Sequence, residues 1–110
     1  MVKRTAGLLG LALALSALPA HAGTLVNWRF DGTSNRLTFQ TSSPVAPQAQ
    51  LIFNPQRIVI DLPGTELLGP KARLPLNGPV REVRVAETQP GVTRLVVELA
   101  PGTSINPSRL

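Results

Sequence analysis

The sequence predicts an all-β fold, a sandwich or an open barrel, and two observations support this. Several stretches alternate apolar and polar residues with the two-residue period of a strand that buries one face. Proline and glycine turns separate them, with 11 Pro and 9 Gly in 110 residues, and no helical period appears after residue 22. Six strands are expected, over residues 25–31, 36–41, 48–53, 57–62, 80–87 and 92–99.

The clearest strand, residues 57–62, is bounded by turn residues on both sides. Asn54-Pro55 precedes it, because proline fixes its own φ and keeps the preceding residue out of the helical region. Pro63-Gly64 follows it and suits the centre of a type II turn, whose second position needs a positive φ. Alternation predicts one core face and one outward face: Ile58, Ile60 and Leu62 inward, and Arg57, Val59 and Asp61 outward.

Two further strands repeat this design, because each begins with an arginine on its outward face. Alternation assigns the apolar side chains to the core: Leu37 and Phe39 in one strand, Leu95, Val97 and Leu99 in the other. The outward residues are Arg36, Thr38 and Gln40 in the first strand, and Arg94, Val96 and Glu98 in the second.

The remaining strands complete two expected hairpins, 25–31 with 36–41 and 48–53 with 57–62. In the first of these strands Val26, Trp28 and Phe30 share a face, and in the third Ala49, Leu51 and Phe53 do. Residues 80–87 also alternate between two faces of a strand. One face carries Arg81, Val83, Val85 and Glu87, and the other carries Val80, Glu82, Arg84 and Ala86. Residues 65–79 are predicted to be the least regular part, because their prolines forbid a long helix.

The N-terminus has the three parts of a secretory signal peptide. Lys3 and Arg4 are basic, residues 6–18 are mostly apolar, and Ala20-His21-Ala22 is a small-x-small cleavage site. A membrane anchor needs about 20 apolar residues, and this run is shorter. We therefore expect a helical signal peptide over residues 1–22, export to the periplasm or cell envelope, and no stable membrane insertion after cleavage.

Cleavage after Ala22 leaves residues 23–110, with nine basic and six acidic residues and a net charge of +3. It also removes the only histidine, and the chain has no cysteine. These absences exclude a His-containing triad, a Cys nucleophile, a Cys/His zinc site and a disulfide from this part of the chain. No glycine-rich phosphate loop is present. Export, modest charge and few aromatic residues argue against a nucleic-acid partner.

The candidate functional surface is the outward face of the arginine-led strands, formed by Arg36, Arg57, Asp61, Arg94 and Glu98 if those strands are neighbours. Arg81 and Arg84 extend it if they lie at its edge. One interpretation is a solvated face, with Arg57 and Asp61, or Arg94 and Glu98, paired across strands for a few tenths of a kcal/mol each. The other is a polyanion- or glycan-binding surface, since guanidinium groups bind carboxylates and phosphates bidentately.

Two other candidates are weaker. Trp28 is the only Trp and would stack on a sugar if exposed, but its strand face favours core packing. Paired carboxylates for glycoside hydrolysis, Asp61 with Glu98 or Asp31 with Glu87, lie on outward faces or in turns rather than in a common cleft. We therefore expect no catalytic residue in this chain.

Several of these stretches together resemble the AMIN domain, the N-terminal module of many periplasmic N-acetylmuramoyl-L-alanine amidases that also occurs in some pilus secretins. The resemblance rests on residues 36–39, on 51–64 with their Asn-Pro, Arg, three aliphatics, Asp, Leu and Pro pattern, and on 83–85 and 93–99. The leader followed directly by Trp28-Arg29-Phe30-Asp31 is most similar to cyanobacterial-type amidase precursors.

The resemblance implies a β-sandwich of two short sheets over residues 23–110, truncated at its C-terminal end. It implies a non-catalytic module that places an exported amidase on peptidoglycan during cell-wall remodelling and division, with peptidoglycan or septal envelope proteins as partners. It implies no cofactor in this chain and zinc only in a downstream amidase domain. The alternative is a protein–protein docking module of an envelope machine such as a pilus secretin, which would pair an edge strand with its partner.

Overall fold

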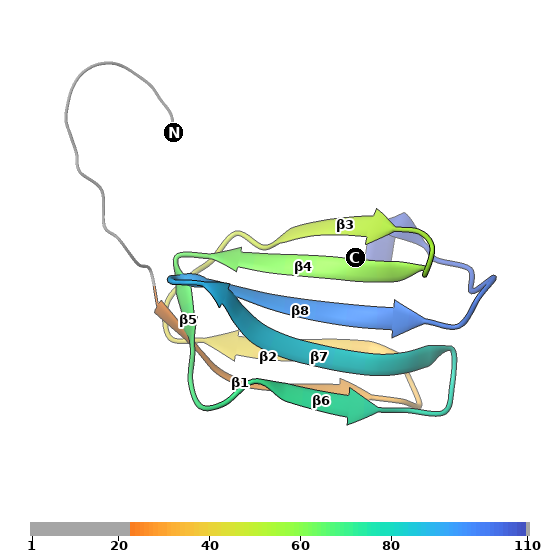
Figure 1. Ribbon diagram of the computed structural model, residues 1–110, viewed down its shortest axis with the longest axis horizontal. Coiled ribbons are helices and arrows are strands. Elements are labelled where there is room, and N and C mark those ends of the chain that lie inside the picture. The colour runs from red at the N-terminus through yellow and green to blue at the C-terminus, as the bar shows by residue number, and fades with distance from the viewer. Residues whose placement is uncertain (1–22, 110) are drawn as a thin grey trace, which may run out of the picture.

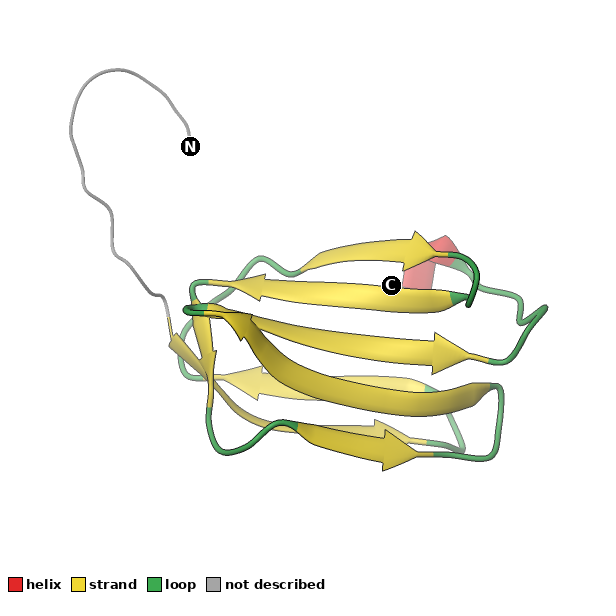
Figure 2. Ribbon diagram, in the orientation of Figure 1, coloured by secondary structure: helices red, strands yellow, loops and turns green. Residues whose placement is uncertain are grey.

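The computed structural model describes residues 23–109, and the expected signal peptide, residues 1–22, lies outside the described part. The described chain is almost entirely strand and loop, with one 3₁₀ helix, Pro107–Arg109 (Figure 2). Its eight strands are β1 (Gly23–Asp31), β2 (Arg36–Thr41), β3 (Gln48–Ile52), β4 (Arg57–Pro63), β5 (Thr65–Leu67), β6 (Ala72–Pro75), β7 (Val80–Gln89) and β8 (Val92–Leu99).

The strands form two sheets that lie face to face. The larger sheet has the order β3-β4-β8-β7-β6, and the smaller has the order β2-β1-β5. Figure 1 shows β1 and β2 as a layer behind β7 and β8. Every neighbouring pair is antiparallel except β1 and β5, which run parallel. The all-β prediction is confirmed, and the fold is the sandwich of two short sheets rather than the open barrel.

All six expected strands are present, and both expected hairpins, β1 with β2 and β3 with β4, are antiparallel pairs. The turns before and after β4 use the predicted residues. Asn54 has a φ of 61° and Gly64 a φ of 62°, a region that asparagine and glycine tolerate better than other residues. Local turn chemistry therefore determines where the central strand begins and ends.

The core lies between the two sheets and is supplied mainly by the inward faces of β4, β7 and β8. Its most buried aliphatic side chains are Leu25, Leu62, Val83, Val85 and Leu95, each no more than 1% exposed. Trp28, Leu37 and Ile60 are half-buried and pack against both halves of this core. The core interpretation of Trp28 is thus confirmed, and it offers no exposed sugar-stacking platform.

Two β-bulges change which residues face the core. A bulge between Leu25 and Asn27 buries Leu25 and leaves Val26 37% exposed, so the inward prediction for Val26 is wrong. A second bulge, between Val80 and Glu82, turns Val80 inward, where it is 6% exposed. An extra residue in one strand reverses the alternation beyond it. The prediction assumed unbroken alternation across residues 25–31 and 80–87, so it did not include either bulge.

Two further side chains depart from their expected exposure. Phe53 was placed in the third strand, on one face with Ala49 and Leu51, but β3 ends at Ile52 and Phe53 lies in the turn that follows, 62% exposed. Val59 was expected to face outward into solvent, yet it is only 4% exposed. It pairs with Gln50 on one side and Val96 on the other, because β4 is an interior strand of its sheet.

The region expected to be irregular contains β5 and β6. The short β5 joins the sheets through a buried pair of threonines, in which the Thr93 hydroxyl donates to the Thr65 carbonyl at 2.9 Å. The Thr65 amide donates in turn to the Gly91 carbonyl at 2.8 Å. The Glu87 carboxylate accepts hydrogen bonds from the Leu67 and Gly91 amides, which lowers the pKa of Glu87.

Candidate binding face

The candidate surface is the outer face of the five-stranded sheet, the side directed away from the three-stranded sheet. We call it the outer face. Charged side chains from four neighbouring strands meet there: Arg57 and Asp61 on β4, Arg94 and Glu98 on β8, Glu82 and Arg84 on β7, and Arg73 on β6. The strand order β4-β8-β7-β6 brings them together from positions up to 41 residues apart.

The strongest ion pair on the outer face joins Asp61 to Arg94. The two residues are direct cross-strand partners, and Arg94 donates from Nε to Oδ1 at 2.7 Å and from Nη2 to Oδ2 at 2.9 Å. This bidentate geometry is the one in which guanidinium and carboxylate bind best. The hydrogen bonds from Arg94 lower the pKa of Asp61, and those to Asp61 raise the pKa of Arg94.

A second cluster links β6, β7 and β8. Arg84 donates from Nη1 to Glu98 Oε1 at 2.8 Å and to Glu82 Oε2 at 3.0 Å. Arg73 Nε lies 3.2 Å from the same Glu82 oxygen. Hydrogen bonds to Glu98 and then Glu82 raise the pKa of Arg84. Glu82 and Glu98 are themselves direct cross-strand partners, so Arg84 offsets the repulsion between two like charges.

The cross-strand pairs differ from the two expected ones. Residues four positions apart on one strand are separated by about 13 Å, so Arg57 and Asp61, like Arg94 and Glu98, are too far apart to pair within a strand. The register instead sets Asp61 opposite Arg94 and Arg57 opposite Glu98. The Arg57 Nη1 donates to the carbonyl of Pro55 in its own turn at 2.7 Å.

Four of the five expected site residues lie together on the outer face, and one does not. Arg36 begins β2, an edge strand of the three-stranded sheet. Of the three arginine-led strands, only β4 and β8 are therefore neighbours, and β2 lies in the other sheet. Arg84 lies on the outer face as expected. Arg81 is the extra residue of the bulge at the start of β7, so it is exposed but does not align with the outward side chains of that strand.

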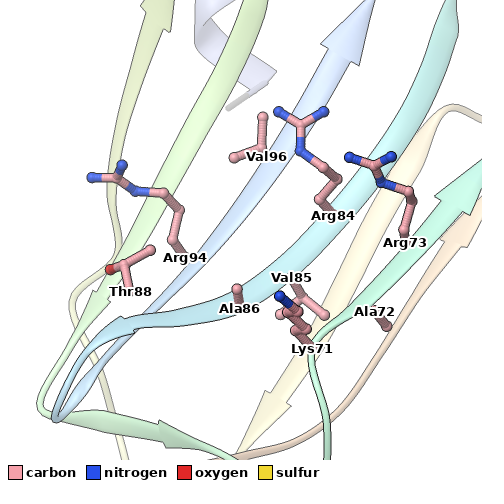
Figure 3. A pocket seen from close by; sticks show the side chains of 9 residues that line it. All are labelled: Lys71, Ala72, Arg73, Arg84, Val85, Ala86, Thr88, Arg94 and Val96. Atoms are coloured by element: carbon pink, nitrogen blue, oxygen red, sulfur yellow. The ribbon is translucent and has the colours of Figure 1, made fainter.

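A shallow groove of about 520 Å³ crosses the outer face over β6, β7 and β8. We call it the basic groove. Figure 3 shows Arg73, Arg84 and Arg94 rising from three successive strands on one side of the sheet, with Ala86 and Val96 lying among them. Its full lining is Lys71, Ala72, Arg73, Arg84, Val85, Ala86, Thr88, Arg94 and Val96.

Sequence reasoning did not include Lys71, Arg73 or Glu82 in the site. The signal for the first two was weak, since β6 has only four residues, ends in Pro75 and closely follows Pro70, and prolines argue against regular structure. Glu82 was assigned to the correct strand without a role. Its role depends on the register that sets it between Arg73 and Arg84, and the register is not encoded in any short pattern.

A second groove, about 1010 Å³, opens between the two sheets along the edge strands β2 and β3. Aliphatic and aromatic side chains such as Phe39, Ile58 and Ile60 contribute to it, together with polar residues of the turns. The described residues contain no cluster of three or more His, Cys, Asp or Glu that could hold a metal ion. In residues 23–109, no helix is long and apolar enough to cross a membrane.

A comparison with protein-family models matched residues 25–109 to the AMIN domain. The chain belongs to the AMIN domain family. The match covers both grooves and every strand of the sandwich apart from the first two residues of β1, and it confirms the resemblance inferred from residues 51–64. AMIN domains are peptidoglycan-binding or targeting modules of amidases and secretins, and they occur in periplasmic and envelope proteins. Comparisons with curated proteins and with solved structures gave no match.

Proposed function

We propose that this AMIN domain is the non-catalytic module that places an exported N-acetylmuramoyl-L-alanine amidase on peptidoglycan. Residues 23–110 bind the wall, and a separate domain of the same protein carries the zinc and hydrolyses the amide bond. The signal peptide directs the protein to the periplasm. The family supports wall targeting in general, and the choice of an amidase over a secretin rests on the resemblance of the leader and first strand to amidase precursors.

The observation that carries this proposal is the outer face. A solvated sheet face has no need for six charged side chains from four strands that form one isolated ion pair and one four-residue cluster, because exposed ion pairs contribute only about 0–1 kcal/mol each. Arg94 and Arg84 are held in fixed positions by the carboxylates beside them. Such fixed arginines lose less conformational freedom on binding a second anion.

Co-sedimentation with purified sacculi tests wall binding. Residues 23–110, shown to be folded by circular dichroism, should sediment with sacculi at low salt and be released as salt rises, because the contact is electrostatic. The folded protein remaining in the supernatant at low salt would contradict wall targeting. In an immunoblot of the envelope fraction against residues 23–110, a band larger than the chain itself is expected for an amidase and for a secretin alike, and a band of about the size of residues 23–110 would contradict the amidase assignment.

The docking alternative is favoured by one feature of the fold. The edge strand β3 pairs only with β4, and Gln48, Ala49 and Gln50 are exposed, so a partner strand has access to its free backbone groups. A proline at a β3 position whose N–H points away from β4 should abolish such docking and leave sacculus binding unchanged. Replacing Arg94 should weaken sacculus binding and leave the docking unchanged.

A further inference from the structure

The basic groove has a charge that the ion pairs of the outer face do not balance. Four cationic residues line it, Lys71, Arg73, Arg84 and Arg94, and none of the three acids bound to these arginines is among the lining residues. Asp61, Glu82 and Glu98 therefore hold the arginines from the sides and leave the groove itself positive. Lys71 forms no ion pair with any acid in residues 23–109.

Each arginine also keeps N–H groups that its acid partners do not use. Arg94 binds Asp61 through Nε and Nη2, which leaves Nη1. Arg84 binds both of its glutamates through Nη1 alone, which leaves Nε and Nη2. Arg73 contacts Glu82 through Nε. Since a guanidinium has five N–H donors, the groove presents several that no bond among the described residues occupies.

The strand register concentrates these charges at a cost to stability. Arg73 and Arg84 are direct cross-strand partners, and Arg84 and Arg94 lie on one diagonal of the β7–β8 pair, with Ala86 and Val96 on the other. Like charges directly opposite each other destabilise a sheet, and three acids, Glu82, Glu98 and Asp61, offset only part of the repulsion among the four cations of the groove. An anion seated among the three arginines would relieve the rest.

The shape and composition of the groove specify the kind of anion. Arg94 already binds one carboxylate bidentately at 2.7 and 2.9 Å, which shows that planar carboxylates fit these guanidinium groups. The small apolar side chains of Ala86 and Val96 lie between the arginines and provide a contact for an aliphatic group rather than for a hydrated phosphate. The preferred ligand is thus a carboxylate attached to an aliphatic chain.

We propose that the basic groove binds the free carboxylates of the peptide stems of the cell wall, with Lys71, Arg73, Arg84 and Arg94 as the ligand-contacting residues. This inference rests on the proposed wall-targeting function and adds the chemical group that is recognised. Uncross-linked stems carry more free carboxylates than cross-linked ones. The groove therefore directs the module to wall that is newly made or being opened.

The test compares untreated sacculi with sacculi whose carboxyl groups have been converted to amides. The full chain, in the processed form that the expressing cells yield, is titrated against both in three versions. These are the unchanged protein, the groove variant Lys71→Gln/Arg73→Gln, and the control Arg29→Gln/Arg36→Gln, which removes the same charge from exposed positions of the three-stranded sheet. Circular dichroism verifies that all three are folded.

Amidation should weaken binding of the unchanged protein and of the control by the same factor, roughly tenfold for the loss of one charge-assisted hydrogen bond. The groove variant should bind untreated sacculi more weakly than the control does and lose less affinity on amidation, because two of the four cationic groups that contact the carboxylate are gone while Arg84 and Arg94 remain. Equal affinity of the unchanged protein for both preparations, or equal loss in the groove variant and the control, overturns the carboxylate assignment alone. No binding to untreated sacculi overturns the wall-targeting function as well.

Discussion

The two faces of the five-stranded sheet differ in what their side chains contribute. The inner face of β7 and β8 is aliphatic, and Val83, Val85 and Leu95 are each no more than 1% exposed. The outer face of the same strands carries Arg84, Arg94 and their acids, which are 20–41% exposed. Adjacent residues of one strand thus serve different purposes, so stability and binding should respond separately to substitution on the two faces.

The largest loss of stability should come from the inner face. Leu95→Ala removes most of a side chain that is 0% exposed, and substitutions of this kind cost about 2–5 kcal/mol through lost burial and the cavity left behind. Urea unfolding followed by circular dichroism measures the change. The fraction that remains folded should bind sacculi with unchanged affinity, and weaker binding by that fraction would show that the faces are not independent.

A smaller loss should come from the threonine pair that joins the sheets. Thr93→Val keeps the shape of the side chain but leaves the buried Thr65 carbonyl without the hydroxyl that donates to it. An unsatisfied buried acceptor costs about 1–3 kcal/mol. Thr24→Val, at a half-buried position of β1, is the control, and thermal unfolding should separate the two. Equal stability of the two variants would mean that the Thr93 hydrogen bond contributes nothing net.

The outer face should contribute to stability mainly through pH. The pKa of Asp61 lies below its ordinary value of 3.8 because Arg94 hydrogen-bonds the carboxylate. Between the folded and unfolded pKa values the unfolded chain binds more protons, so the stabilisation is present above about pH 5 and is lost as pH falls through the folded pKa. The pair is partly exposed, so its size is about 0.2–1 kcal/mol.

Asp61→Asn measures this contribution directly. The free energy of unfolding of the variant, measured by urea unfolding at a series of pH values between 2 and 7, should fall less at acid pH than that of the unchanged protein. Asp31→Asn is the comparison, because Asp31 is the exposed last residue of β1 and its pKa is lowered by hydrogen bonds from the adjacent turn, Thr33 first, rather than by an arginine on another strand. If Asp61→Asn leaves the pH profile unchanged, the bidentate pair does not stabilise the fold.

The smallest effect on stability should be that of Arg73→Gln. Arg73 is 67% exposed and has one contact with Glu82, and surface substitutions of this kind usually stay within about 0.5 kcal/mol. Its effect on sacculus binding should be larger than that of Arg29→Gln on the other sheet. A stability loss comparable to that of Thr93→Val would assign Arg73 to the fold rather than to binding.

Local patterns were sufficient for the strands and turns but not for their relative placement. Alternation identified six strands, and Asn54 and Gly64 marked the limits of β4, because these properties depend on neighbouring residues. The bulges at Val26 and Arg81 depend on hydrogen bonding to a partner strand, so no local pattern reveals them. The three-residue β5 is too short to show alternation, and its parallel partner β1 is about 40 residues away.

The sequence predicted which types of residue form the candidate site, but not which individual residues lie together in it. The rule that strands begin with an outward arginine selected Arg57 and Arg94, which lie on neighbouring strands of one sheet, but it also selected Arg36, which belongs to the other sheet. Strand order is a property of the whole fold, and it determines which outward arginines are neighbours. The same order adds Arg73 and Lys71, whose segment had no recognisable strand signal.

The most direct test of the central claim is to map the surface that contacts the wall. Amide chemical shifts of isotope-labelled residues 23–110 would be recorded by NMR as soluble peptidoglycan fragments are added. Shifts clustered on β6, β7 and β8 around Arg84 and Arg94, with β1 and β2 unaffected, are the result expected if the outer face binds the wall. Shifts confined to β2 and β3, along the second groove, would contradict it and favour an edge-strand docking module.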